Sequence, residues 1–85
     1  MILAFTKKAQ RSYKKLPLNL QRKADKQFSY LLSNYRHPSL RARKMSGQDS
    51  FEARIDIHYR FTFQIKEDTI YILTVGSHDE GLGKK

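Results

Sequence analysis

The sequence predicts a single α+β domain with the element order β-α-α-β-β-β, in which two helices cover one face of a mostly antiparallel sheet. Three observations predict it. A chain of 85 residues has enough interior for one core only. Residues 20–35 repeat apolar side chains with the period of a helix, and residues 51–65 alternate apolar and polar side chains with the period of a strand. We therefore assign residues 1–85 to one domain.

The first strand and helix occupy the N-terminal part of the chain. Residues 2–5 are apolar, which predicts a short buried strand. Thr6 is a favourable N-cap for a helix that Pro17 ends or separates from the next one. Three apolar side chains recur at helical spacing between them: Ala9, Tyr13 and Leu16.

The second helix has the strongest pattern in the sequence. Six apolar side chains fall on one helical face: Leu20, Ala24, Phe28, Leu31, Leu32 and Tyr35. Pro38 stops this helix, because a proline forces the preceding residue out of the α region. We expect residues 39–50 to form a basic connector that ends in a turn and is attached to the core by Leu40 and Met45.

The C-terminal half changes to a period of two. Residues 51–57 and 59–65 each present one apolar and one polar face, and the alternation slips at a reversal near residues 56–58. Residues 66–68 make the next turn. Residues 70–75 are apolar on both faces, which predicts an interior strand.

Charge is distributed unevenly along the chain. Seventeen basic and eight acidic residues give a formal charge of +9. Twelve of the basic residues and a single acidic one, Asp25, lie in residues 1–48, so this part carries a net charge of +11. Such asymmetry predicts a surface that faces nucleic acid, although charge alone fits a well-solvated basic surface equally well.

The remaining composition narrows the class of protein. The chain has no cysteine, so disulfides and thiolate metal sites are excluded. No stretch approaches the roughly 20 apolar residues of a membrane span, and the apolar run at residues 1–5 is too short for a signal peptide. We expect a cytoplasmic protein without a membrane segment. No metal-ligand spacing or Gly-rich phosphate loop is present, so we expect no metal and no cofactor.

Polar side chains gather on one face of the predicted sheet. Glu52, Arg54, Arg60 and His58 lie in or beside its strands, and His78 follows the last strand. Two guanidinium groups on one face can bind a phosphate between them, and an imidazole can donate or accept a proton near neutral pH. Attack of a ribose 2′-OH on its neighbouring phosphate needs these parts, namely an acid or base and positive charge on the developing phosphorane.

Each of these side chains also has an ordinary structural explanation. Arg54 can form a cross-strand ion pair with Glu52 or Asp56. Arg60 can be a solvated strand residue, and His78 can be a polar loop residue. Spacing alone leaves these alternatives open.

Several short motifs recur in a fixed order. Leu40-Arg41 to Ser46-Gly47 lead into Phe51-Glu52-Ala53-Arg54-Ile55, followed by Tyr59-Arg60-Phe61-Thr62-Phe63 and then by Ile72-Leu73-Thr74-Val75-Gly76-Ser77-His78. In this order and at these separations, the chain resembles the RelE/ParE superfamily of toxins from bacterial type II toxin–antitoxin systems. Its histidine makes it most similar to the YafQ-like and YoeB-like relatives.

The resemblance implies a β-α-α-β-β-β toxin, and its RelE-like branch cleaves mRNA in the ribosomal A site. It implies that Arg60 stabilises the transition state at the scissile phosphate, that Arg54 binds or orients the phosphate, and that His78 is the general acid or base. Glu52, which stands where RelE has a lysine, is a second candidate base. The C-terminal tyrosine of RelE has no counterpart.

The resemblance also implies partners. We expect a cognate antitoxin in a hetero-oligomeric complex, and the ribosome with its mRNA. Basic and imidazole side chains outside the catalytic set are the expected RNA contacts: Arg22, Lys26, Arg41, Arg43, Lys44 and His58. Two other functions stay open, namely a ParE-like inhibitor of DNA gyrase and a non-catalytic RNA-binding relative.

Overall fold

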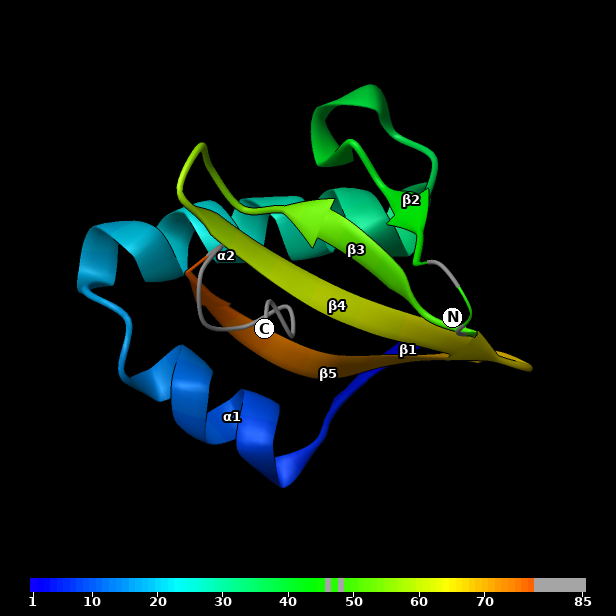
Figure 1. Cartoon of the computed structure of the whole chain (residues 1–85), viewed down its shortest axis with the longest axis horizontal. Coiled ribbons are helices and arrows are strands. Elements are labelled where there is room, and N and C mark those ends of the chain that lie inside the picture. Colours follow the sequence, from blue (N-terminus) through cyan, green and yellow to red (C-terminus); the bar gives the residue numbers. More distant parts are fainter. Residues whose placement is uncertain (46, 48, 78–85) are drawn as a thin grey trace.

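The computed structural model describes residues 1–45, 47 and 49–77. Its elements, drawn in Figure 1, are β1 (Ile2–Phe5), α1 (Lys7–Lys14), α2 (Leu18–Ser33), the 3₁₀ helix η1 (Pro38–Leu40), β2 (Arg43–Lys44), β3 (Phe51–Arg54), β4 (Tyr59–Lys66) and β5 (Thr69–Ser77).

The strands form one five-stranded sheet in the order β1-β5-β4-β3-β2. The pairing of β1 with β5 is parallel, and the other pairings are antiparallel. The predicted fold class is therefore confirmed, and β5 is paired on both sides, as its apolar sequence predicts. The prediction that residues 39–50 only connect α2 to β3 was wrong in one respect, because this segment contains most of η1 and the strand β2. Sequence patterns miss a two-residue strand, since it has no room for an alternation.

The helix boundaries follow from local hydrogen bonds. Thr6 caps α1 as predicted, because its hydroxyl oxygen accepts the N–H of Ala9 at 3.1 Å. Helix α2 ends at Ser33, before the predicted Tyr35, because Asn34 is extended and its side-chain oxygen accepts the N–H of Arg36. Tyr35 therefore lies beyond the helix.

The core lies between the helices and one sheet face. Both helices contribute to one cluster with the sheet, in which α1 packs against β5 (Figure 1). The most deeply buried large side chains are Phe61, Phe63, Leu31, Leu40, Ile70 and Ile72. Leu40 attaches the connector to the core as predicted. The opposite face of β3 and β4 is thereby left to their polar side chains.

The reversal between β3 and β4 is built around Asp56. Its Oδ1 accepts the backbone N–H groups of His58 at 2.8 Å and Tyr59 at 2.9 Å, and its Oδ2 lies 3.6 Å from Nζ of Lys23. Burial raises the pKa of the Asp56 carboxyl, but the two N–H groups and Lys23 outweigh it, so the pKa lies below its ordinary value. An aspartate that bonds two following N–H groups explains a turn without glycine.

This turn yields a stability prediction. Asp56→Ala should lower the free energy of unfolding at pH 7 by about 1–3 kcal/mol, because two backbone N–H groups of the turn, those of His58 and Tyr59, lose a charged acceptor. Asp56→Asn keeps a side-chain oxygen as acceptor and should lower the free energy of unfolding by less. Since the carboxyl pKa is depressed in the folded state, its stabilisation is present above the unfolded pKa and is lost as the pH falls through the folded pKa. Urea unfolding from pH 7 to pH 3 should therefore bring wild type and Asp56→Asn closer together; a constant difference would contradict this explanation.

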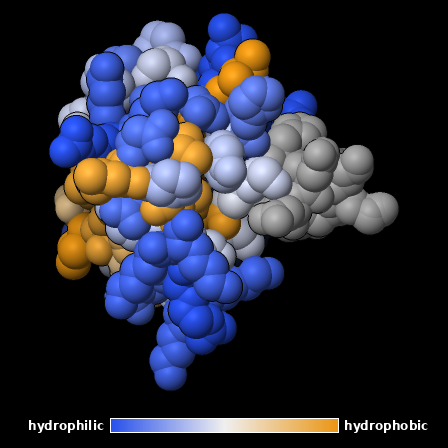
Figure 2. Space-filling model, turned by 90° about the vertical axis from the view of Figure 1, so that its left-hand side faces the viewer, coloured by the Kyte–Doolittle hydropathy of each residue, from blue (hydrophilic) through white to orange (hydrophobic). Residues whose placement is uncertain are grey.

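Large hydrophobic side chains are exposed on several elements of the structure, including β1, α2 and the β3–β4 turn. In the space-filling view of Figure 2, hydrophobic atoms form one larger area and a smaller separate patch near the top, with hydrophilic surface between them. No helix among the described residues combines the length and the apolar character that a membrane crossing requires.

Candidate functional site

A pocket of about 260 Å³ lies on the polar face of the sheet. We call it the anion pocket. It is lined by Ala53 and by five charged residues: Arg41, Arg43, Glu52, Arg54 and Arg60. Four guanidinium groups face a single carboxylate, so the pocket carries a net positive charge and suits an anionic ligand. All five were among the predicted site residues.

Strand register brings these side chains together. Arg54 lies opposite Arg60, and Arg43 lies opposite Glu52, so that residues from three strands share one face. Arg41 enters from the end of η1, where its backbone is left-handed with φ of 48°. That conformation redirects the chain from η1 into β2.

Glu52 connects two of the arginines. Nε of Arg43 donates to its Oε1 at 3.0 Å, and Nε of Arg60 lies 3.8 Å from its Oε2. The side chains of Glu52 and Arg60 are only 11% and 16% exposed, whereas that of Arg43 is 76% exposed. The buried carboxylate thus separates two like charges and holds the Arg60 guanidinium against the sheet.

Arg60 is also bound to the turn beside it. Its Nη1 donates to the carbonyl oxygens of Asp56 at 2.9 Å and of Ile57 and Tyr59 at 3.3 Å. Arg60 therefore links the polar face to the β3–β4 turn, and part of its hydrogen-bonding capacity is used inside the protein.

Arg54 differs from Arg60 in this respect. Its guanidinium makes no hydrogen bond or ion pair with any other residue that the structure describes. Its backbone is fixed, because the carbonyl oxygen accepts Nε2 of the buried Gln27 at 2.7 Å. Arg54 also borders a second groove of about 360 Å³ that Lys23 and Lys26 line. Among the described residues, therefore, none accepts from its five N–H donors, and the side chain lies between two basic depressions.

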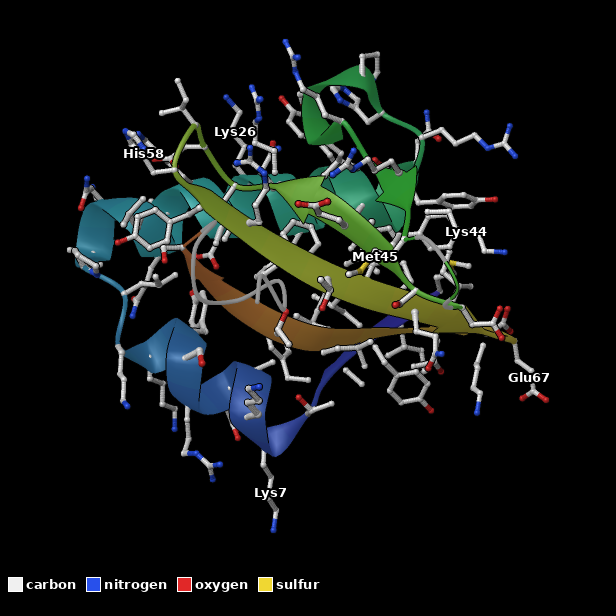
Figure 3. All side chains as sticks on the ribbon, viewed as in Figure 1. Lys7, Lys26, Lys44, Met45, His58 and Glu67 are labelled. Atoms are coloured by element: carbon white, nitrogen blue, oxygen red, sulfur yellow. The ribbon has the colours of Figure 1, made fainter. Side chains whose placement is uncertain are left out.

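The other predicted RNA contacts are spread more widely. Lys26 shares the groove with Arg54, and Lys44 lines a pocket that also includes Arg41 and Arg43. Figure 3 shows His58 and Lys26 near one end of the sheet and Lys44 near the other. Arg22 and His58 are exposed and line neither basic depression. His78 lies outside the described residues.

Two residues that support the site were not predicted. Gln27 anchors Arg54, and Asp56 offers its carbonyl oxygen to Arg60. A polar side chain on the predicted apolar face of α2 was the available signal for Gln27, because a buried amide requires partners. Among the described residues, no group of three His, Asp or Glu side chains is arranged to hold a metal ion.

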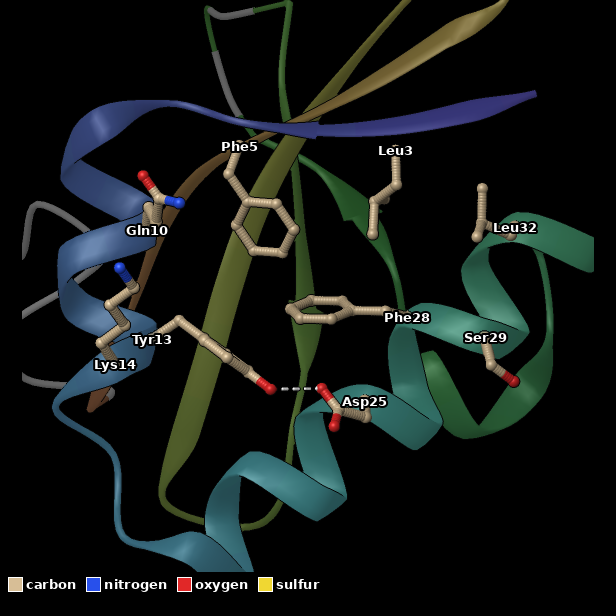
Figure 4. Close-up of a pocket in the computed structure, with 9 residues that line it drawn as sticks. All are labelled: Leu3, Phe5, Gln10, Tyr13, Lys14, Asp25, Phe28, Ser29 and Leu32. Carbon is tan, nitrogen blue, oxygen red and sulfur yellow. Dashed lines mark hydrogen bonds between the residues drawn. The ribbon is translucent and has the colours of Figure 1, made fainter.

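A different, apolar pocket of about 430 Å³ lies between β1, α1 and α2 (Figure 4). Its lining includes Phe5 and Phe28, whose rings meet edge to face with centroids 5.4 Å apart. The hydroxyl of Tyr13 donates to Oδ1 of Asp25 at 2.6 Å across this pocket. That hydrogen bond, with burial and the negative charge of Asp25, raises the pKa of Tyr13 to about 12.

Comparison with known proteins identifies the family. A family model described as the ParE toxin of the type II toxin–antitoxin system parDE matches residues 3–82. The chain belongs to this family. It is therefore a toxin of a type II toxin–antitoxin system, and the RelE/ParE assignment from the sequence is confirmed. A search of curated proteins finds no match.

Solved structures agree with the fold of this toxin. The YoeB/ParE toxin from Agrobacterium tumefaciens superposes with a TM-score of 0.82 at 13% identity, covering 92% of this chain and 99% of that one. RelE in the intact E. coli RelBE complex gives 0.75 at 20% identity, with 89% and 94% covered. The YoeB–YefM complex from Staphylococcus aureus gives 0.78 at 16% identity, with the same coverage. Because these sequence identities are low, the similarity to these structures establishes a shared fold only.

Proposed function

We propose that this toxin is a ribosome-dependent mRNA endonuclease. One observation carries the proposal: four guanidinium groups and one carboxylate line the anion pocket, and the guanidinium of Arg54 is not bound by any other described residue. A phosphodiester requires such an environment, because negative charge builds up on its oxygens as the 2′-OH attacks. RNA supplies that nucleophile itself, so the protein has to hold the phosphate and move protons.

The residues divide this work. Arg54 binds the phosphate through its open fork, and Arg60, held by Glu52 and the turn carbonyls, stabilises the developing charge from a fixed position. His78 is the general acid or base, and Glu52 is the second candidate base. Because the Glu52 carboxylate already contacts Arg43 and Arg60, proton transfer through it requires one of these contacts to open.

The basic side chains around the anion pocket guide the RNA. Lys26 lies on one side of Arg54, and Arg41, Arg43 and Lys44 lie on the other. The proposed partners are the ribosome with its mRNA and a cognate antitoxin. Two of the similar structures are toxin–antitoxin complexes, and an antitoxin with an acidic segment would neutralise the anion pocket.

The second candidate is inhibition of DNA gyrase without nuclease activity. The matching family description, a ParE toxin, favours it. It differs from the first candidate in chemistry, because a gyrase inhibitor needs a binding surface and no proton-transferring group.

One set of assays separates the two functions. Translating ribosomes are incubated with wild type or His78→Ala and analysed by toeprinting, and the same proteins are added to a gyrase supercoiling assay. The nuclease predicts new mRNA ends with wild type only, and loss of growth arrest for His78→Ala. Inhibited supercoiling with intact mRNA, together with a His78→Ala variant that stays toxic, would instead establish the gyrase inhibitor. If the protein binds RNA but shows neither activity and causes no growth arrest, the remaining function is that of a non-catalytic RNA-binding relative.

A further inference from the structure

A second basic pocket adjoins the anion pocket at the edge strand β2. It has a volume of about 360 Å³, and Arg41 and Arg43 line both pockets. Strand alternation explains the arrangement: Arg43 pairs with Glu52 on the polar face, whereas Lys44 pairs with Phe51 on the opposite face. The two pockets therefore lie on the two sides of β2, with shared arginines between them.

The walls of this pocket differ from those of the anion pocket. Two aromatic side chains, Tyr35 and Phe51, line it together with Arg36 and Lys44. Phe51 is stacked on Phe63 with ring centroids 5.3 Å apart, which holds its ring in place. The guanidinium carbon of Arg36 lies 5.7 Å from the centroid of Tyr35. None of the described residues that line this pocket is acidic. We call it the aromatic pocket.

Aromatic rings beside cations are the chemistry by which proteins bind unpaired nucleobases. Single-stranded RNA is recognised by stacking its bases on aromatic side chains or on arginine planes, while cations follow its backbone. The pocket volume of about 360 Å³ falls in the range of about 300–1,000 Å³ that is usual for small-ligand sites.

We propose that the aromatic pocket binds the base of an RNA nucleotide adjacent to the phosphate held in the anion pocket. This rests on the proposed function, because it takes the ligand of the anion pocket to be an RNA phosphate. Arg41 and Arg43, which line both pockets, contact the backbone between the phosphate and the base. Tyr35 and Phe51 supply the stacking surface, and Arg36 contacts the base or the next phosphate.

Binding of short RNA to the full-length toxin tests this inference. The probes are a fluorescein-labelled RNA trinucleotide, with 2′-deoxyribose at the first and middle positions so that neither phosphodiester has a 2′-OH nucleophile, and two versions that lack the first or the third base. One abasic version is expected to bind about 5- to 100-fold more weakly than the intact probe, as for the loss of a base–aromatic stack. Equal affinity of all three probes, or no binding of any, would overturn the inference.

Substitutions in the aromatic pocket test whether the weaker binding of the abasic probe arises there. Tyr35→Leu and Phe51→Leu remove an aromatic face while keeping an apolar side chain, and both should erase most of the difference between intact and abasic probes. Tyr71→Leu is the matched control, since Tyr71 is an exposed aromatic residue of β5 outside the pocket. If both leucine variants fold, as checked by thermal melts, and still discriminate like wild type, the inference is wrong. If neither variant folds, the affinities of the wild-type toxin for the intact probe and the two abasic probes decide whether the inference holds.

The two proposals can fail separately. A toxin that leaves mRNA intact on ribosomes but distinguishes intact from abasic RNA has the aromatic pocket without the proposed nuclease. A toxin that cleaves mRNA while Tyr35→Leu and Phe51→Leu change neither binding nor the choice of cleavage position has the nuclease without the pocket.

Discussion

Replacing Arg54 with alanine is expected to slow mRNA cleavage by about 100- to 1,000-fold, the usual cost of removing one group that stabilises developing negative charge. The structure gives a reason to select this arginine. Its guanidinium is unengaged by any other described residue, so its donors are available to a phosphate, whereas Arg60 donates Nη1 to three carbonyl oxygens. Cleavage is measured by primer extension on translating ribosomes at a saturating toxin concentration.

Two further variants make the interpretation specific. Arg54→Lys keeps the charge but loses the planar fork, so its rate should lie between those of wild type and Arg54→Ala. Arg11→Ala removes the same side chain from the exposed surface of α1, away from the anion pocket, and should leave the rate within about twofold, as surface substitutions usually do. The proposed role of Arg54 is wrong if Arg54→Ala cleaves as fast as Arg11→Ala.

Phe61→Ala is expected to lower the free energy of unfolding by about 3–5 kcal/mol, the range for truncating a buried phenylalanine. Phe61 is fully buried on β4, where its ring meets Phe28 of α2 at a centroid distance of 5.0 Å and Phe63 at 5.8 Å. A domain of 85 residues has a total stability of only about 4–13 kcal/mol, so this variant is expected to be partly or wholly unfolded at 37 °C.

Urea unfolding followed by circular dichroism measures this effect. Ile57→Ala, at a turn position that is 69% exposed, removes an apolar side chain without opening a cavity and should change stability by less than about 0.5 kcal/mol. Antitoxin binding should raise the apparent stability of Phe61→Ala, because a ligand that binds only the folded state shifts the equilibrium by mass action. Equal midpoints for the two alanine variants would show that the aromatic contact between α2 and β4 contributes little.

Local patterns determined the arrangement of most elements in advance. The helical stripe of α2 and the alternation of β3 and β4 are consequences of burying one face, so both can be predicted from side-chain chemistry alone. The same alternation placed Glu52, Arg54 and Arg60 on one polar face, which the strand register confirms. The cap at Thr6 was predictable because its hydrogen bond spans three residues.

Contacts between distant parts of the chain decided the rest. That β2 exists, and that Arg41 and Arg43 enter the anion pocket, depends on pairing with β3, which no local period encodes. The sequence left open whether Glu52 or Asp56 would pair with Arg54; the structure instead joins Glu52 to Arg43 and Arg60, and Asp56 to Lys23. Ion pairs form where folded strands and helices bring charges within about 4 Å, and sequence spacing does not fix that distance.

The sequence by itself thus determined the family, the fold class and the charged residues that share the polar face of the sheet. Only the tertiary structure distinguished Arg60, which is bound by carbonyl oxygens and Glu52, from Arg54, whose guanidinium contacts no other described residue. The tertiary structure also brought Tyr35 and Phe51 into one neighbouring pocket. The physical reason is that the hydrogen bonds of a guanidinium depend on which carbonyl oxygens and carboxylates the completed fold places around it.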